Sequence, residues 1–270
     1  MALIGSLTSG VSALNAFTKS IETIGDNIAN ANTTGFKSST TRNQDSFSQT
    51  LKSATLTSSA LQVGSGVNIS TNKQNFNQGS LSSTGIATDI GIAGNGFFKV
   101  INPVTHEELL TRSGNFKIDA TGYLVDAAGL RVQGLKGATA GDIQVTNVST
   151  NPLQSFSISD SGILTEFYSD STSAATNTIN LWNFNDPTGL ERAGANNYRA
   201  TPAAGVINVL GDQAGTLGLG TTKQGTLELS NVDLAQEFSD LITAQRSFQA
   251  ASRIITVSDT VLQEIVDLKR

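Results

Sequence analysis

Apolar residues recur at helical spacing at both ends of the chain and alternate with polar residues in the middle. In the first segment they fall three or four positions apart and form a single stripe. The stripe contains Ile4, Leu7, Val11, Leu14, Phe17, Ile21, Ile24, Ile28 and Ala31. This nearly heptad spacing predicts a helix about 40 Å long with a narrow apolar seam.

The last part of the chain predicts a second long helix. Ser230 and Asp233 have the spacing of a capping box, which places the helix start at Ser230. Two sets of apolar residues follow, one recurring every seven positions (Leu234, Leu241, Phe248, Ile255, Leu262) and a further row beside it (Ile254, Val261, Leu268). The helix is expected to continue to near Arg270, over about 55 Å.

Short alternating runs interrupted by glycine fill the middle of the chain, the clearest at 96–101, 115–119, 122–126, 130–135, 155–167 and 178–184. The segments 119–122 and 160–162 are hairpin turn signals. The pattern predicts an α+β fold with a terminal helix and turn over 1–42, a β-rich outer domain over 75–225 and a terminal helix over 226–270. Residues 43–74, rich in serine and threonine, are expected to form an extended connection.

Each predicted helix needs a partner, because an isolated amphipathic helix is only marginally stable in water. The narrow seams favour pairing of the two helices as a coiled coil over docking of each on the sheet. A pair leaves apolar surface uncovered, and copies of the same chain joined head to tail would cover it in a helical filament. The predicted coiled-coil and polymer interface comprises Leu7, Val11, Leu14, Ile21, Ile24, Ile28, Leu234, Leu241, Phe248, Ile255 and Leu262.

Composition and charge argue against several other functions. The chain has 270 residues, a net charge of −5, no cysteine and a single histidine. Without a basic stripe we expect no nucleic-acid partner, and without cysteine there are no disulfides or thiolate metal sites. His106 lies in a polar turn without partners, so we expect no catalytic residue, no metal and no cofactor. The glycines between Gly91 and Gly96 precede a strand, which favours a tight turn over a phosphate-binding loop.

No uninterrupted apolar run approaches the roughly 18 residues that a membrane-spanning helix needs, so we expect no membrane insertion. No basic residue precedes the first apolar positions, a pattern unlike that of a cleaved signal peptide.

The segment 27–37, Asn-Ile-Ala-Asn-Ala-Asn-Thr-Thr-Gly-Phe-Lys, resembles the signature of the bacterial flagellar axial proteins, the rod and hook subunits. The matching residues are Asn27, Ala29, Asn30, Thr33, Gly35, Phe36 and Lys37. The segment 230–268 is similar to the C-terminal region of the same family, and 94–100, 111–129 and 184–198 are similar to its central segments. The asparagines are expected to end the helix by competing for backbone hydrogen bonds, Gly35 to supply a positive φ, and Phe36 to anchor the returning chain.

The resemblance implies a structural protein that is exported unfolded through the flagellar type III apparatus without a cleaved signal. Such proteins polymerise into a hollow tube whose inner wall is built from the paired terminal helices. The implied partners are further copies of the chain, the neighbouring axial proteins, and the export and cap machinery. The implied location is the hook outside the cell or, for a rod protein, the periplasm.

Within the family, the segments 9–14, 24–30 and 129–135 favour the hook protein, which transmits torque from rod to filament. The length, which leaves room for one β domain only, is typical of the distal or proximal rod proteins of the basal body. We therefore expect a hook subunit, with a rod protein as the alternative. A hypothesis from another class is an extracellular, adhesin-like β domain on a helical stalk.

Overall fold

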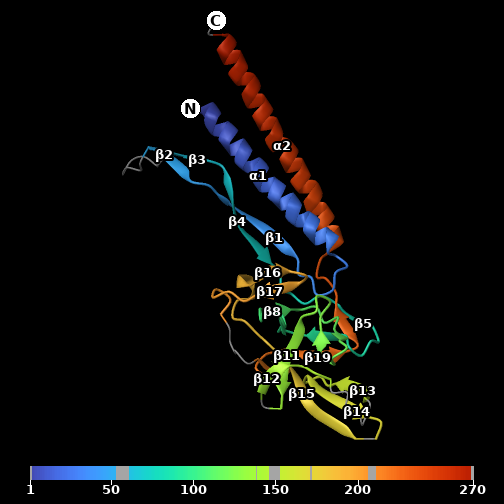
Figure 1. The fold of residues 1–270 in the computed structure, drawn as a ribbon. Helices are drawn as coiled ribbons and strands as arrows, with labels where there is room; N and C mark the ends of the chain where they lie inside the picture. The colour runs from blue at the N-terminus through green and yellow to red at the C-terminus, as the bar shows by residue number, and fades with distance from the viewer. Residues whose placement is uncertain are drawn as a thin grey trace. The chain divides into compact units, whose positions relative to one another are not determined.

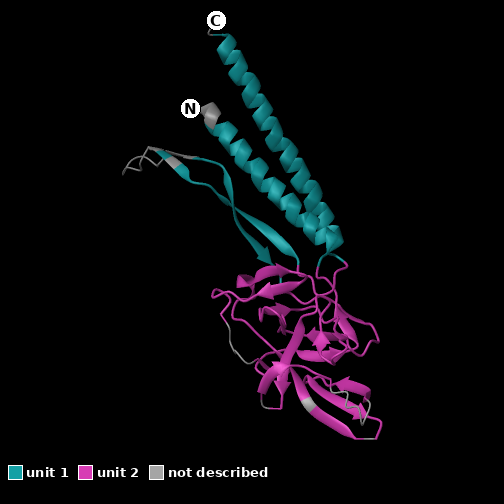
Figure 2. Cartoon of the chain, viewed as in Figure 1, with its two compact units in different colours: residues 1–31, 38–75, 232–270 teal, residues 32–37, 76–231 magenta. Residues whose placement is uncertain are grey.

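The computed structural model describes residues 2–52, 61–137, 139–145, 153–170, 172–205 and 211–268, which fall into two compact units (Figure 2). The helical unit comprises 1–31, 38–75 and 232–270, and the β unit comprises 32–37 and 76–231. Both terminal segments therefore belong to one unit, while the end of the N-terminal motif belongs to the other.

The helical unit contains the two predicted helices, α1 (Ala2–Ala29) and α2 (Leu234–Asp267), side by side and antiparallel (Figure 1). The expected start of the second helix at Ser230 is wrong. Asp233 is the N-cap, and its side chain accepts hydrogen bonds from the backbone N–H groups of Ala235 and Gln236. A carboxylate at this position accepts hydrogen bonds from the first unpaired N–H groups of the helix, and its negative charge interacts favourably with the positive end of the helix dipole.

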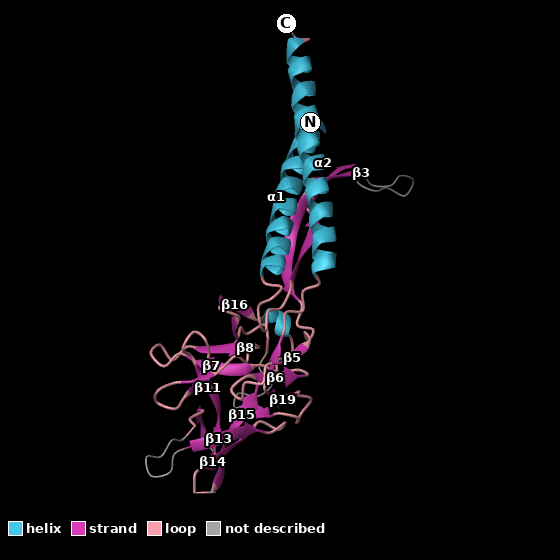
Figure 3. Cartoon of the chain, turned by 90° about the vertical axis from the view of Figure 1, so that its right-hand side faces the viewer, coloured by secondary structure: helices cyan, strands magenta, loops and turns pink. Residues whose placement is uncertain are grey.

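Four strands form an arm beside the helices (Figure 3). They are β1 (Ser39–Asp45), β2 (Ser48–Lys52), β3 (Leu61–Gly64) and β4 (Val67–Gln74). β1 pairs with β4 and β2 pairs with β3, all antiparallel. Polar contacts join the arm to α1: among them, the Val67 N–H donates to Ser12 Oγ over 3.2 Å, and Thr41 Oγ1 donates to Thr23 Oγ1 over 2.9 Å.

The β unit contains the remaining strands and one short 3-10 helix. These are β5 (Leu81–Ser83), β6 (Ile90–Ala93), β7 (Phe98–Ile101), β8 (Glu108–Thr111), β9 (Lys117–Ile118), β10 (Leu124–Val125), β11 (Arg131–Lys136), β12 (Thr139–Asp142), β13 (Leu153–Ile158), β14 (Ile163–Tyr168), β15 (Ser173–Leu181), η1 (Pro187–Gly189), β16 (Glu191–Gly194), β17 (Asn197–Arg199), β18 (Asp212–Gln213), β19 (Thr221–Gln224) and β20 (Thr226–Glu228). Among the described residues, the largest sheet has the order β13-β14-β15-β11-β7-β8-β17-β16. β20 pairs with β5, and β19 with β6.

Strand β7 and the residue directly before it, Phe97, supply apolar residues to the two hydrophobic clusters of the β unit, because successive side chains of an extended chain point to opposite faces. Phe98 and Val100 lie in the larger cluster with Ile90, Ile92, Phe116, Val132, Ile179 and Leu181. Phe97 lies in the second cluster with Leu110, Trp182, Phe184, Leu190 and Tyr198. Phe97 stacks edge-to-face on Phe76, Phe184 and Tyr198, with ring centroids 5.6 to 6.1 Å apart.

Both predicted hairpin turns are confirmed. Gly122 adopts φ 85° between β9 and β10, and Gly162 adopts φ 81° between β13 and β14. The glycine-rich segment before β7 is a tight turn, as predicted, with Gly94 at φ 118° and Gly96 at φ 128°. A side chain at Gly94 would meet the backbone of Gly220, at 2.7 Å from its Cα.

Candidate functional site

Small residues occupy the centre of the contact between α1 and α2. Gly10 and Ala16 are buried on α1, and Ala244, Ala251 and Ser258 are buried on α2. A Cβ at Gly10 would lie 3.0 Å from Ile255 Cγ1, so the absence of a side chain there allows the helices to approach closely. Near the N-terminus of α1, Ser6 Oγ and Ser258 Oγ of α2 share a hydrogen bond of 3.3 Å.

The predicted interface residues flank this centre. Leu7, Leu14, Ile21, Ile24 and Ile28 are half-buried on α1, and Leu241, Ile255 and Leu262 are half-buried on α2. Val11, Leu234 and Phe248 are exposed, with 44%, 42% and 37% of their surface accessible. Val11, Leu234 and Phe248 therefore remain accessible to a partner outside the chain.

Much of the apolar surface of α2 is not covered by α1. The exposed large apolar side chains of α2 are Leu234, Phe238, Ile242, Phe248, Ile254, Val257, Ile265, Val266 and Leu268. An apolar surface of this extent is unusual for a protein that works as a monomer and marks an interaction site. Of the row expected to remain uncovered, Ile254 and Leu268 are exposed and Val261 is half-buried.

Asn27, the first residue of the motif, joins three parts of the helical unit. Its amide Nδ2 donates to the Ser39 carbonyl oxygen over 2.8 Å and to Glu237 Oε1 over 2.9 Å, and its Oδ1 accepts from the Ser39 N–H. The side chain is 1% exposed. The expectation that Asn27 ends the helix by a local contact is wrong, because its side chain links α1 to β1 and α2. Asn30 fits that role, since its Nδ2 donates to the Asp26 carbonyl oxygen over 2.9 Å.

The second half of the motif lies in the β unit and folds against it. Gly35 adopts φ 69°, as predicted, and its N–H donates to the Glu228 carbonyl oxygen over 2.8 Å. A Cβ there would lie 2.6 Å from the Ser113 N, so the site excludes any side chain. Phe36 is buried, and the Arg192 guanidinium lies 4.8 Å from its ring centroid.

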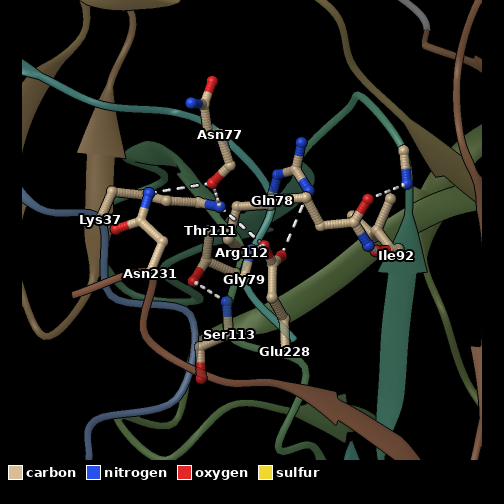
Figure 4. Close-up of polar contacts among 11 residues, drawn as sticks. Lys37, Asn77, Gln78, Gly79, Ile92, Thr111, Arg112, Ser113, Glu228 and Asn231 are labelled. Atoms are coloured by element: carbon tan, nitrogen blue, oxygen red, sulfur yellow. Dashed lines mark hydrogen bonds and ion pairs between the residues drawn. The ribbon is translucent and has the colours of Figure 1, made fainter. Parts of the chain in front are cut away.

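Lys37, the last motif residue, enters a fully buried ion cluster (Figure 4). Its Nζ donates to Glu228 Oε1 over 2.7 Å and to the Asn77 carbonyl oxygen over 2.8 Å. Arg112 Nη1 donates to Glu228 Oε2 over 3.2 Å, and the Gly79 N–H donates to Oε1 over 2.9 Å. A single carboxylate thus compensates two cations that are removed from water.

Burial lowers the pKa of Lys37, and the charge of Arg112 adds to this effect while Glu228 opposes it. Burial also lowers the pKa of Arg112, again against the effect of Glu228. Desolvation is the largest cause for both groups, so the cluster is stable only with its anion in place. The side chains of Lys37, Glu228 and Arg112 are almost completely removed from solvent, which is typical of a structural ion cluster and not of a site that binds a substrate.

The remaining chemistry of the described residues is sparse. His106 lies in an exposed turn at φ 53°, as the sequence predicts. Across the described ranges, no three His, Cys, Asp or Glu side chains are placed to hold a metal ion together. Neither α1 nor α2, over its described length, is apolar enough to cross a membrane.

Three family descriptions match this chain in succession. Residues 7–37 match a flagella basal body rod protein, 91–166 match the D1 domain of the flagellar hook protein FlgE/F/G, and 223–268 match the C-terminal part of the flagellar basal body rod FlgEFG proteins. Over 274 residues the chain is 36% identical to the flagellar basal-body rod protein FlgG of Bacillus subtilis, covering 99% of this chain and all of the relative. The chain belongs to the family of flagellar rod and hook proteins.

Further relatives of this axial protein include the rod protein FlgG of Borreliella burgdorferi, 32% identical over 99% of this chain and 100% of the relative. The hook protein FlgE of Treponema pallidum is 40% identical over 118 residues, which cover 44% of this chain and 25% of that protein. A solved hook protein, FlgE2 of Helicobacter pylori, has a TM-score of 0.24 and 12% identity over 63% of this chain and 47% of that chain, which is too low to bear on the fold. The relatives named here are rod and hook proteins, not enzymes.

The expectation of a hook subunit is not what the relatives favour. Likeness to rod proteins extends over nearly the whole axial protein, whereas likeness to the hook protein stops at less than half of it. Short segments such as 129–135 misled the sequence interpretation, because the D1 domain that contains them is shared by hook and rod proteins. Length, which pointed to a rod protein, was the better guide.

Sequence reasoning also missed the partners of Lys37. Arg112 and Glu228 lie far from it in the chain, in a β8-flanking turn and at the end of β20. No local signal in the sequence indicates this pairing. Glu228 alternates with Leu227 and Leu229 inside the region matched at 223–268, and such alternation usually places a glutamate on the solvent-facing side of a strand.

Proposed function

We propose that this axial protein is a rod protein of the flagellar basal body. The observation that carries the proposal is the 36% identity to a rod protein over 99% of the chain. A rod is a stiff tube, and the chain has features that such a polymer needs: two terminal helices in one unit, and an apolar face on α2 that the described residues leave exposed. The hook protein is the second candidate, favoured by the 40% identity over 118 residues to a hook protein.

In this proposal the helices α1 and α2 pair as a coiled coil and form the inner wall of the tube. Leu7, Leu14, Ile21, Ile24 and Ile28 pack towards α2, and the exposed side chains of Val11, Leu234 and Phe248 contact further copies. Neighbouring axial proteins would use the same surface at the two ends of the polymer. We further propose export through the flagellar type III apparatus without a cleaved signal, and a periplasmic location.

The experiment is negative-stain electron microscopy of the concentrated, purified full chain. Straight hollow tubes support a rod protein, and curved tubes support the hook alternative. Phe248 is 37% exposed in the single chain, and in this proposal another copy covers it. Phe248→Asp is expected to abolish the tubes, because assembly would then have to bury a charge. Gln249→Asp, at the next and already polar exposed position of α2, is the matched control and should leave the tubes intact.

Folding of both variants is checked in each unit: circular dichroism reports on the helices of the helical unit, where positions 248 and 249 lie, and the fluorescence of Trp182, the only tryptophan, reports on the β unit. Tubes formed by Phe248→Asp at the wild-type yield would contradict the role of the exposed α2 face. A wild-type chain that stays monomeric at every concentration, alone and with basal-body fragments as seeds, would contradict polymerisation altogether.

A further inference from the structure

Helices α1 and α2 and strand β1 border an open groove of about 260 Å³ within the helical unit. Its walls are partly apolar, from Phe17, Ile24 and Ala244, and partly polar, from Ser20, Thr23, Ser39, Thr40, Thr41, Asn43, Thr243 and Ser247. A volume below about 300 Å³ is small for a drug-sized ligand and suits one or two large side chains.

The groove carries negative charge and an unsatisfied hydroxyl. Glu237 and Asp240 lie in its wall, and the lining residues include no lysine or arginine. Burial raises the pKa of Glu237, and the neighbouring charges of Asp240 and Asp233 add to this effect against the hydrogen bond from Asn27. Ser39 is 4% exposed, and its Oγ has no hydrogen-bond partner among the described residues. A buried hydroxyl without a partner is costly, so the groove favours an occupant that brings a hydrogen-bond donor and a positive charge.

The C-terminal segment of the chain has the complementary chemistry. In three contacts between α1 and α2, the residue numbers (6 with 258, 10 with 255, 27 with 237) add to 264 or 265. Residue 2 of α1 is therefore opposite a position near 262, and the end of α2 continues past α1. This overhang carries Ile265, Val266 and Leu268, which are 50%, 64% and 87% exposed. Lys269 and Arg270 follow it in the sequence.

The overhang cannot reach the groove of its own chain. Leu268 follows the groove residue Ala244 on the same straight helix by about 24 residues, which corresponds to about 36 Å. The two complementary surfaces therefore meet only between different copies. A contact of this kind is heterologous: each copy offers one groove and one overhang, and repetition gives an open chain of subunits.

Building on the proposed function, we propose that the overhang of α2 from one copy, with Leu268 as the apolar anchor and Lys269 and Arg270 as the cations, binds in the groove of the next copy. Leu268 would contact the apolar wall at Phe17 and Ile24. The basic residues would compensate Glu237 and Asp240 and supply the donor that Ser39 Oγ lacks. The acidic groove and the basic segment then fix the direction of each subunit, because neither surface complements itself.

Cysteine crosslinking tests this contact in the full chain, which contains no cysteine of its own. The double variant Thr243→Cys, Leu268→Cys places one thiol in the groove and one on the overhang. Mild oxidation at high protein concentration should give a ladder of dimers, trimers and longer species on a non-reducing gel. Each single variant should stop at the dimer. The pair Arg246→Cys, Leu268→Cys is the matched control, because Arg246 is exposed on α2 and does not line the groove; its ladder should be at least tenfold weaker.

A second comparison tests the charges. Asp240→Lys in the Thr243→Cys, Leu268→Cys chain should weaken the ladder about tenfold, and mixing with chains that carry Lys269→Glu and Arg270→Glu should restore it. A missing ladder, or equal ladders from the groove pair and the control pair, overturns the inference. Tubes without the ladder would leave the rod proposal standing and remove only this contact. A ladder without tubes would support the contact and contradict the rod proposal.

Discussion

Replacing Glu228 by glutamine is the sharpest test of the buried ion cluster, because the change keeps the shape of the side chain and removes only its charge. In the wild type, one anion compensates Lys37 and Arg112, whose side chains are 0% and 3% exposed. In Glu228→Gln, two buried cations face each other without an anion. Removing one partner of a buried ion pair in this way costs about 3–5 kcal/mol. We expect the free energy of unfolding of the β unit to fall by that amount.

Lys37→Met is the matched control. It also removes one member of the cluster, but it leaves Glu228 paired one-to-one with Arg112 and still bonded to the Gly79 N–H. The lost charged hydrogen bonds are worth about 1.5–3 kcal/mol each, and relief from burying an ammonium group offsets much of that loss. We expect a net loss of about 0–2 kcal/mol. The double variant Lys37→Met, Glu228→Gln should be more stable than Glu228→Gln alone, because it returns the cluster to a single buried cation.

Urea unfolding of the four chains, followed by the fluorescence of Trp182, measures these differences in the β unit. Circular dichroism of the helices, recorded on the same samples, reports on the helical unit. The reasoning fails if Glu228→Gln and Lys37→Met destabilise the β unit equally, or if the double variant loses the sum of both single losses. Either outcome would mean that the charges act independently and that water reaches them.

Two further predictions use pairs of positions that differ in one respect. Gly25 of α1 has open space around a would-be Cβ, so Gly25→Ala should raise the stability of the helical unit by about 0.5–1 kcal/mol. Gly10→Ala should raise the stability less or lower it, because its Cβ would lie 3.0 Å from Ile255 of α2. Thermal melts followed by circular dichroism at a helical wavelength compare the two variants. A hydrogen bond to Glu166 raises the pKa of Tyr168 to about 12. The alkaline difference spectrum between wild type and Tyr168→Phe should therefore have its midpoint near pH 12. In a Glu166→Gln background the midpoint should move towards pH 10. Since the pKa of Tyr168 is raised on folding, the contact with Glu166 stabilises the fold below pH 10, and this stabilisation is lost as the pH rises through about 12. A midpoint near 10 in the folded wild type would show that the contact does not form.

The helices and turns were predictable from the sequence because local rules determine them. Seams at three- and four-residue spacing identified α1 and α2, and the positive φ of Gly35 and Gly122 follows from turn geometry. Which side chains α2 leaves exposed was less predictable. A periodic pattern shows that an apolar face exists, but not whether Leu234 or Ala244 is nearest the partner helix; the close approach at Gly10 decides this by allowing only small residues at the centre.

The polar contacts of the motif were beyond sequence reasoning for another reason: their partners are distant in the chain. Asn27 reads as a helix-ending residue, because asparagine commonly has that local role. Its actual partners lie on β1 and α2, and the latter, Glu237, is 210 positions away. Lys37 likewise reads as a surface lysine after a turn, and only the fold brings Glu228, 191 positions away, to its Nζ. Long-range pairs of this kind leave no periodic signal.

The motif acts in both units, and this explains why its two halves differ in chemistry. Asn27, an uncharged side chain, bonds inside the helical unit to the Ser39 backbone of β1 and to the Glu237 carboxyl of α2. Ten residues later, Lys37 uses a charge inside the β unit, where the strand that leads to α2 ends at Glu228. The chain segments that leave α1 and enter α2 are thereby both fixed in the β unit, through the Gly35 N–H to Glu228 bond and the Lys37 to Glu228 ion pair. If the helices assemble with other copies, as proposed above, this arrangement is useful, because the segment after the end of α1 and the segment before the start of α2 are held by contacts within the β unit that do not depend on the polymer. Loss of Lys37 or Glu228 should then affect the β unit in the free subunit, whereas loss of Phe248 should affect only assembly.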